Sequence, residues 1–314
     1  MEIRGVIIDD TFAEAFGMRG ARVIITAATE KWARTAALSM TGFATSVIGC
    51  KVEAGIEREL SAEETPDGRP GVSVLVFTMD SASLVKRLIE RIGQTVLTCP
   101  TTACFDGIPD APERVGVGGP LRTFGDGFQS SKVIAGVRYW RIPVMEGEFL
   151  VQEEFGKVKG IGGGNFLILA ESEDAALDAA ESAVEAMRGT PGVILPFPGG
   201  IVRSGSKVGS KRYKGMIATT NDAFSPTLRA VTDTELPEGV NSVFEIVLDG
   251  LDARCISDAK RKGIDAACRP GVVRITAGNY GGKLGPHHFH LHAIMRGETS
   301  GVAQEKPAEK APSK

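Results

Sequence analysis

One carboxylate stands inside an otherwise apolar strand. Glu245 is the only charged residue between positions 243 and 248, where its neighbours are β-branched, aromatic or aliphatic. With the two-residue period of a strand, Glu245 shares a face with Val243 and Val247, and the opposite face is apolar as well. Full burial raises a Glu pKa by roughly 3 to 5 units, and a neutral carboxylic acid can donate a hydrogen bond. The pattern predicts an oxyanion stabiliser or general acid, although a glutamate on a sheet edge that leans into water would fit the same residues.

All four histidines lie in a second stretch that could do chemistry, HHFHLH at residues 287 to 292. On a strand, His288, His290 and His292 would share one face and could hold a metal ion with a carboxylate from elsewhere. Amidohydrolase-type metal enzymes place a His-x-His after their first barrel strand, whereas this one follows the other elements and no repeated barrel pattern precedes it. We therefore expect no metal site, only ordinary histidines on a terminal strand. A metal-dependent deformylase or amidohydrolase is the alternative.

Glycine-containing loops follow the returning strands of the chain, and two of these loops also carry lysine or arginine. The cationic residues are Lys207, Lys211, Arg212 and Lys283. Glycine lets backbone amides approach a ligand closely, and the cations would meet anionic groups, so together the loops predict a binding cleft. PFPGGIVRSGSKVGSK misses the P-loop spacing by one residue, and GGGNF leads into a strand, so neither is a nucleotide fingerprint. Loops that merely turn the chain would show the same glycines.

The elements that must position these residues repeat as strand, helix and strand. The helices are predicted to begin after Thr29, Asp80, Glu173 and Asp252, and the strands are expected at residues 23–26, 43–50, 72–77, 95–98, 166–170, 193–195, 243–248 and 272–276. A further short strand is expected at 137–142. Two such units in sequence make a ferredoxin-like βαββαβ lobe, so we expect an α+β fold of two duplicated lobes. The expected domains are residues 1–148, residues 149–295 with Glu245, and a disordered tail at 296–314 that lacks aromatic residues.

Composition narrows the class of protein. The chain has 314 residues, 42% hydrophobic and 24% charged, with a net charge of −3, which suits a globular protein of about two domains. This balance gives no reason to expect nucleic acid or a membrane surface as a partner. The beginning of the chain lacks a signal-peptide pattern, and no apolar run reaches membrane-spanning length. Five dispersed cysteines favour reduced thiols, and a cytoplasmic location is expected.

A set of stretches between residue 9 and about residue 292 is more specific than any single motif. They are DTFAEAF, EETPDGRPGV, FGDGF, VMEGEF, GGNF, PFPGGIV, SKVGSK, TND, ELPEGV with the Glu245 strand, and PGVVRITAGNYGGKLG. In this order the chain resembles the formylmethanofuran:tetrahydromethanopterin formyltransferase family. The resemblance implies an oligomeric enzyme of two ferredoxin-like lobes that needs no prosthetic group. Its substrates would be tetrahydromethanopterin and a methanofuran-type coenzyme, and the family's buried catalytic Glu corresponds to Glu245.

The near-neutral charge and the KPAEKAPSK tail resemble the version from methylotrophic bacteria more than the strongly acidic archaeal members. That version implies either a homo-oligomer or a subunit of a formyltransferase/hydrolase complex that uses a methanofuran analogue. In such a complex an amidohydrolase-type partner subunit would release formate. The tail and the pair His287–His288 are departures to which we assign no role.

The implied chemistry is direct attack of a pterin nitrogen on a formamide, which creates one tetrahedral oxyanion. Holding both coenzymes in a reactive arrangement supplies roughly 7 to 11 kcal/mol, and one well-placed donor such as Glu245 about 3 to 4 kcal/mol more. The candidate substrate-binding residues are polar or cationic positions of the loops, namely Lys207, Ser210, Lys211, Asn221, Asp222, Asn279 and Lys283. A non-catalytic coenzyme-binding subunit of a complex is a further alternative.

Overall fold

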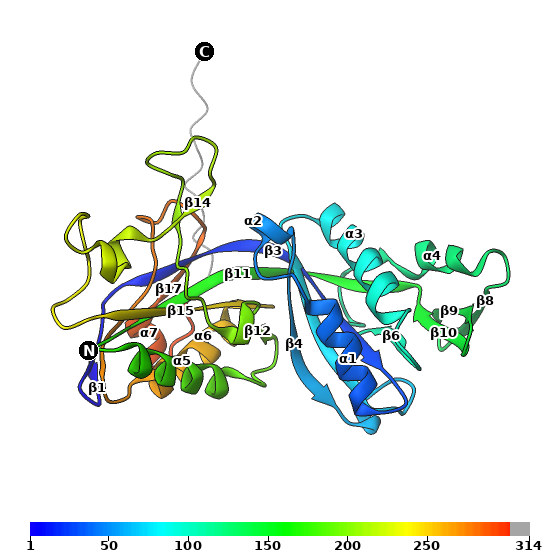
Figure 1. Ribbon diagram of the computed structural model, residues 1–314. Helices are drawn as coiled ribbons and strands as arrows, with labels where there is room; N and C mark the ends of the chain where they lie inside the picture. The colour runs from blue at the N-terminus through cyan, green and yellow to red at the C-terminus, as the bar shows by residue number, and fades with distance from the viewer. Residues whose placement is uncertain (302–314) are drawn as a thin grey trace, which may run out of the picture.

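The computed structural model describes residues 1–301 as a mixed α+β protein of two lobes, and the α+β prediction is confirmed (Figure 1). Two long strands, β3 (Phe12–Thr26) and β11 (Glu154–Ala170), run through both lobes. They pair antiparallel between Phe16 and Gly20 on β3 and Gly162 and Val158 on β11, where the lobes meet. The lobes are therefore joined by continuous sheet.

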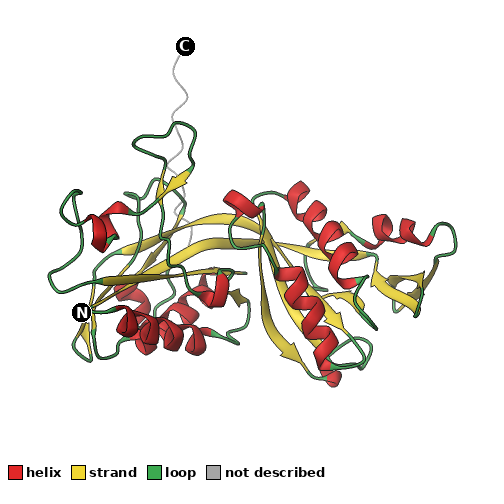
Figure 2. Ribbon diagram, in the orientation of Figure 1, coloured by secondary structure: helices red, strands yellow, loops and turns green. Residues whose placement is uncertain are grey.

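Each lobe is built from four strands and two helices in the same connection. The first lobe contains β3, α1 (Glu30–Thr41), β4 (Glu53–Leu60), β5 (Gly71–Thr78), α3 (Ser81–Arg91) and β6 (Ala103–Asp106), with strand order β6-β3-β5-β4. The second contains β11, α5 (Glu173–Met187), β12 (Val193–Ile194), β15 (Ser242–Gly250), α6 (Ala253–Ala267) and β16 (Val272–Thr276), with order β16-β11-β15-β12. In both lobes the neighbouring strands are antiparallel, and the order is fourth, first, third, second. Figure 2 shows α5 and α6 together on one side of the sheet of the second lobe.

Further short elements extend both lobes. Those at the far end of the first lobe are β7 (Glu113–Gly116), α4 (Gly118–Leu121), β8 (Ser130–Ile134), β9 (Val137–Val144) and β10 (Gly147–Gln152). Those of the second lobe are β1 (Glu2–Ile3), β2 (Val6–Ile8), β13 (Lys207–Val208), β14 (Ala218–Thr219), β17 (His287–His290) and α7 (Leu291–Met295). The short single turns are α2 (Val47–Cys50) and the segments η1 (Ala62–Glu64), η2 (Ile92–Val96), η3 (Arg122–Gly125), η4 (Pro198–Gly200), η5 (Asp222–Phe224) and η6 (Pro226–Leu228). The strand expected at 137–142 is confirmed as β9.

The predicted caps Asp80 and Asp252 are confirmed, whereas the side chain of Thr29 makes no capping hydrogen bond and two predicted strands are wrong. The carboxylates of Asp80 and Asp252 accept hydrogen bonds from backbone amides three residues on, each at 2.8 Å. Residues 43–50 contain the helical turn α2 instead of a strand, and β4 begins only at Glu53. Residues 95–98 also form no strand, because α3 continues into the π-helical turn η2, whose Ile92 and Val96 point into the core of the first lobe.

The hydrophobic cores do not follow the expected boundary at residue 148. Val6, Ile8 and Ala15 belong to the core of the second lobe, with α5 and α6, because β1, β2 and the beginning of β3 lie on that side. Phe155, at the beginning of β11, belongs to the core of the first lobe. Residues 1 to about 16 therefore pack with the second lobe, since β3 and β11 each cross between the lobes.

The predicted tail begins too early. Ser300 is 8% exposed and exchanges hydrogen bonds of 3.1 Å with Ser257 of α6, its N–H donating to the hydroxyl and its carbonyl accepting from it. The carbonyl of Gly301 meets Nδ1 of His287 at 2.7 Å. Residues 296–301 are thus packed on the second lobe, and the remainder of the predicted tail, 302–314, lies outside the described residues. In the described part of the chain, no helix has the length and apolar character needed to cross a bilayer.

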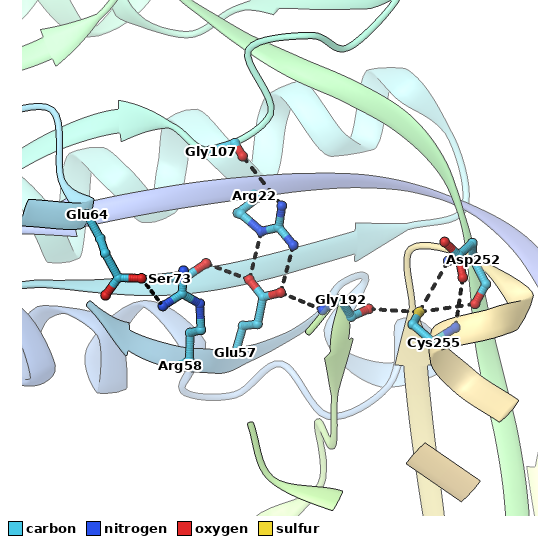
Figure 3. A network of polar contacts seen from close by, with 9 residues as sticks. All are labelled: Arg22, Glu57, Arg58, Glu64, Ser73, Gly107, Gly192, Asp252 and Cys255. Atoms are coloured by element: carbon cyan, nitrogen blue, oxygen red, sulfur yellow. Dashed lines mark hydrogen bonds and ion pairs between the residues drawn. The ribbon is translucent and has the colours of Figure 1, made fainter. Parts of the chain in front are cut away.

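An ion pair in the first lobe connects to the second lobe through the backbone (Figure 3). Arg22 of β3 donates from two nitrogens to the two carboxylate oxygens of Glu57 of β4, each at 2.7 Å. Ser73 donates to Glu57 at 2.6 Å, and the backbone N–H of Gly192, which precedes β12, donates to it at 2.5 Å. Burial raises the pKa of Glu57, but these donors and the charge of Arg22 outweigh it and hold the pKa below its usual value.

Candidate active site around Glu245

The backbone of Glu245 is held on both sides within the second lobe. Its neighbour on β11 is Leu167, and on the other side it exchanges hydrogen bonds of 2.8 and 3.0 Å with Val202. Ile246 and Leu248, on the opposite face of β15, pack in the core beneath α5 and α6. The face of Glu245 instead carries a smaller apolar cluster, in which residues 224–240 of the long connection between β12 and β15 cover the sheet.

The side chain of Glu245 combines burial with one fixed hydrogen bond. Nδ2 of Asn165, on β11, donates to Oε1 of Glu245 at 2.8 Å. Burial raises the pKa of Glu245 to about 7, although the bond from Asn165 favours the ionised form and opposes the shift. Within residues 1–301, Oε2 makes no hydrogen bond, and it is not among the buried atoms that lack a partner. One oxygen of a half-protonated carboxyl group is thus accessible to a ligand.

The loop after β16 lies beside this carboxyl group. Burial raises the pKa of Tyr280, and so do the charges of Glu245 and Glu14. Its hydroxyl donates to the backbone carbonyl of Ser206 at 3.0 Å. Tyr280 therefore joins the loop of residues 277–286 to the glycine-containing loop that precedes β13.

The glycine-rich loop after β16 wraps around a carboxylate of the protein. Glu14 of β3 accepts hydrogen bonds from the backbone amides of Tyr280, Gly282 and Leu284 at 2.5, 2.6 and 2.6 Å. Glu14 is 3% exposed, and burial raises its pKa, but these amides outweigh burial and lower it. The expectation that amides of this loop approach a ligand is wrong for these three, because Glu14 already occupies them.

Three of the predicted binding residues form one charged cluster. Lys207 contacts Asp222 and donates to the carbonyl of Thr220 at 2.9 Å, and Lys211 pairs with the other oxygen of Asp222 at 2.7 Å. The two lysines hold the pKa of Asp222 far below its usual range. The cluster carries one net positive charge, with Lys211 exposed to solvent.

The other four predicted binding residues make no hydrogen bond or ion pair with this cluster in the described part of the chain: two bond near neighbours, one bonds Thr11 and one is exposed. Ser210 accepts from the amides of two following residues at 3.2 and 2.8 Å, and the carbonyl of Asn221 accepts from Ser225 at 2.7 Å. Asn279 donates to Thr11 at 2.8 Å, and Lys283 is exposed. Within residues 1–301 no hydrogen bond or ion pair joins any of the seven predicted binding residues to Glu245.

Two cavities of the described part lie at the junction of the lobes. One of about 620 Å³ is lined by Arg22, Glu57, Arg58 and Glu64, whose charges are already paired. Another of about 790 Å³ is lined by the PFPGG stretch, residues 196–200, together with residues after α1. None of the candidate residues lines either cavity.

The histidines do not form the face that would suit a metal ion. His288 and His290 lie on β17, but the chain turns into α7 at Leu291, so His292 is helical and leaves that face. His292 contacts the carbonyl of Ile8 at 2.8 Å, and His288 contacts that of Gly285 at 3.2 Å. Among residues 1–301, no group of three or more His, Cys, Asp or Glu side chains is placed to hold a metal ion. The strand-face arrangement of three histidines is therefore wrong.

Sequence reasoning did not single out Asn165, Tyr280 or Glu14, although each lies in a stretch that carried the family resemblance. Their side chains meet Glu245 and its neighbouring loop only because β11, β15, β16 and β3 are adjacent in the second lobe. A buried asparagine after three glycines, in GGGNF, was the one local signal available.

Comparisons with known proteins agree over both lobes. The family model of formylmethanofuran-tetrahydromethanopterin formyltransferase matches residues 1–144, and the model described as its proximal lobe matches residues 147–294. The formyltransferase of Methylobacillus flagellatus is 64% identical over 94% of this chain and 100% of its own length.

Two solved structures share the fold at high identity. The enzyme from Methanosarcina barkeri is 53% identical, with a TM-score of 0.89 over 94% of this chain and 100% of that one. A chain of the formyltransferase/hydrolase complex from Methylorubrum extorquens, solved with methylofuran, is 50% identical, with a TM-score of 0.91 over 94% of this chain and 98% of that one. The chain therefore belongs to the formylmethanofuran–tetrahydromethanopterin formyltransferase family.

Proposed function

We propose that this chain transfers a formyl group between formylmethanofuran, or an analogue, and tetrahydromethanopterin, with Glu245 as its catalytic acid. Family membership supports this reaction, since relatives matched over their whole length are named formylmethanofuran–tetrahydromethanopterin formyltransferase. It makes the chain a formyltransferase with these coenzymes as substrates. The role of Glu245 rests on its own surroundings.

The observation that carries this role is a carboxyl group with a pKa near 7 and one accessible oxygen. When the pterin nitrogen attacks the formyl carbon, negative charge develops on the formyl oxygen. A protonated Glu245 can donate to that oxygen, and the interaction strengthens as the charge grows, so it lowers the barrier more than it tightens binding. Proximity of the two coenzymes supplies the rest.

The binding loops have a supporting role in the proposal. The pair Lys207 and Lys211, with one excess positive charge, would meet anionic parts of a coenzyme. Tyr280 connects this loop to the carboxyl site. Asn279 and Lys283, on the exposed side of the same loop, would contact the outer part of a coenzyme, as would Ser210 and Asn221.

We also propose that the lobes are ferredoxin-like units related by duplication, which the shared strand order supports. The similarity to a chain of a formyltransferase/hydrolase complex supports assembly of this chain in an oligomer or such a complex. A cytoplasmic location fits the five cysteines, all of which are free thiols.

Steady-state kinetics of Glu245→Gln and Glu245→Ala test the acid. Glu245→Ala removes the donor, so we expect turnover to fall by about 10²- to 10³-fold, with a smaller change in KM. Glu245→Gln keeps a neutral donor of similar shape and should retain more activity. Near wild-type turnover of a folded Glu245→Ala enzyme would show that this carboxyl group does not act in catalysis.

A further inference from the structure

We propose that Asn165 is a positioning residue that fixes the carboxyl group of Glu245 and directs its proton to Oε2, the oxygen open to substrate. The inference rests on the proposed function of Glu245, and it concerns which oxygen acts. Asn165 is 9% exposed and lies on β11, opposite Val247 of β15.

The orientation of the Asn165 amide follows from a neighbour that can only donate. The backbone N–H of Gly278 lies 3.0 Å from Oδ1 of Asn165. A backbone N–H has no acceptor capacity, so the amide atom that faces it must be the oxygen. The nitrogen of the same amide therefore faces Glu245, where it lies 2.8 Å from Oε1. The oxygen of the Asn165 amide thus bonds the loop after β16, and its nitrogen bonds Glu245.

This orientation assigns the two oxygens of Glu245. An oxygen that accepts from an N–H at 2.8 Å serves as the carbonyl oxygen of the neutral acid. The proton then resides on Oε2, for which no hydrogen bond is formed within residues 1–301. If the amide were reversed, its oxygen would accept a hydrogen bond from the O–H of Glu245. That O–H would then not be available to the substrate. Asn165 thus turns a buried carboxyl group into a donor with one direction.

Asn165 is itself held by a residue on the other side of the sheet. Lys260 of α6 is fully buried, and its Nζ donates to the backbone carbonyl of Asn165 at 2.9 Å. The ammonium group also lies over the ring of Phe289, 5.3 Å from its centroid. Backbone and side chain of Asn165 are therefore both fixed, which keeps its amide from turning.

Two substitutions at Asn165 separate positioning from simple packing. Asn165→Ala removes a bond that favours ionised Glu245, so the pKa of Glu245 rises. Because the acid must be protonated, activity declines above its pKa, and the alkaline limb of the pH profile should move to higher pH. Turnover at the plateau should fall on the order of 10- to 100-fold, the usual cost of losing an outer-shell partner, with less change in KM.

Asn165→Asp places a second carboxyl group against Oε1 with nearly unchanged shape. Near neutral pH the two groups share one proton between them, so turnover should be lower than in Asn165→Ala. On acidification the new carboxyl becomes protonated and can donate to Oε1, as the amide did. Activity should then recover towards the acid side in Asn165→Asp but not in Asn165→Ala.

Gly278→Ala perturbs the amide from the other end. A Cβ at Gly278 would lie 2.7 Å from Nδ2 of Asn165, so the amide must shift while Glu245 and Asn165 remain in the chain. We expect lower turnover together with a displaced alkaline limb. Asn241→Ala is the matched control for Asn165→Ala, because among residues 1–301 the side-chain amide of Asn241 donates to the carbonyls of Glu171 and Gly239, at 3.0 and 3.2 Å, and to no other group.

Activity and thermal melts of all variants, with Glu245→Ala alongside, decide between the outcomes. The inference is supported if Glu245→Ala loses activity and the alkaline limb of the pH profile of Asn165→Ala lies at higher pH than that of the wild type. The inference is overturned if Glu245→Ala loses activity but Asn165→Ala keeps the wild-type turnover and alkaline limb. The proposed role of Glu245 would then still stand. A lower plateau with an unmoved limb also overturns the inference, because packing alone would give that result. Near wild-type activity of Glu245→Ala would instead overturn the proposed catalytic role of Glu245.

Discussion

The carboxyl groups of Glu53 and Asp249, which come from different lobes, lie close together in the buried junction, and each affects the pKa of the other. Asp249 is fully buried and Glu53 is 7% exposed. Oδ1 of Asp249 accepts from the amide of Gly163 at 3.0 Å, while its Oδ2 is buried and has no hydrogen-bond partner among residues 1–301. Burial and the charge of Glu53 raise the pKa of Asp249 well above its usual value, and a protonated Oδ2 can donate to Glu53.

Replacing this proton with an amide is expected to preserve the junction. In Asp249→Asn the oxygen can accept from Gly163 and the nitrogen can donate to Glu53, so every bond is kept without a titrating group. Folding raises the pKa of this carboxyl group. The free energy of unfolding therefore falls as the pH rises from the pKa of the unfolded chain, near 3.8, towards the pKa of the folded chain. Relative to Asp249→Asn, the wild-type chain should therefore become less stable across that window.

Thermal melts of both proteins between pH 4 and pH 8 measure this difference. At pH 7 we expect Asp249→Asn to melt at or above the wild-type temperature, and Asp249→Ala, which leaves a cavity and an unpaired Glu53, to melt lower. A large loss of stability in Asp249→Asn at neutral pH would mean that the pair is not held by a shared proton.

The ion pair of Arg22 and Glu57 should show the opposite dependence on pH (Figure 3). Glu57→Gln leaves Arg22 without its partner, so we expect a loss of about 3 to 5 kcal/mol of unfolding free energy at neutral pH. Because burial is outweighed by Arg22 and the pKa of Glu57 is lowered, its stabilisation is present above the unfolded pKa and disappears as pH falls through the folded one.

Urea denaturation of wild type and Glu57→Gln at pH 7 and near pH 3 measures this stabilisation. The gap between the two proteins should narrow on acidification. Arg58→Gln is a control, because Arg58 pairs with Glu64 at 2.7 Å on the surface, with both side chains more than 40% exposed. Such a pair contributes at most about 1 kcal/mol. Equal losses in the two variants would contradict a special role for the buried pair.

Glu245 could be found from sequence because its signal is local: a single carboxylate within an apolar strand needs no knowledge of neighbours. Asn165 could not, because its relation to Glu245 depends on the pairing of β11 with β15, between residues 80 positions apart. Glu14 is still further in sequence from the loop that it bonds, since 266 positions separate it from Tyr280. Long-range register carries these contacts, and periodicity within a segment holds no information about it.

The same limit explains the errors in the fold. Helix starts at Asp80 and Asp252 were predictable because a cap is a contact over three residues. The strand expected at 95–98 was wrong because its apolar residues are buried as a continuation of α3, against the core of the first lobe. Strands β3 and β11 cross the junction, so the boundary between lobes in space is not a boundary in sequence.

Lys260 is a buried amine, and burying its positive charge should lower the free energy of unfolding. Burial lowers its pKa from 10.5 to about 7, and within residues 1–301 no carboxylate pairs with it. Below pH 7 the amine is protonated in both the folded and the unfolded chain, and the fold bears the full cost of the buried charge. Between pH 7 and 10.5 the folded chain binds fewer protons than the unfolded one, so this cost shrinks as pH rises.

Lys260→Met removes the titration at nearly constant shape, although it leaves the carbonyl of Asn165 without this donor. The unfolding free energy of wild type, taken relative to Lys260→Met, should be flat below pH 7 and rise by about 1.4 kcal/mol per pH unit above it. Urea denaturation of both proteins at pH 6, 7, 8 and 9 provides the comparison. Parallel curves over this range would mean that Lys260 has the same pKa folded and unfolded, and that its ammonium group reaches water.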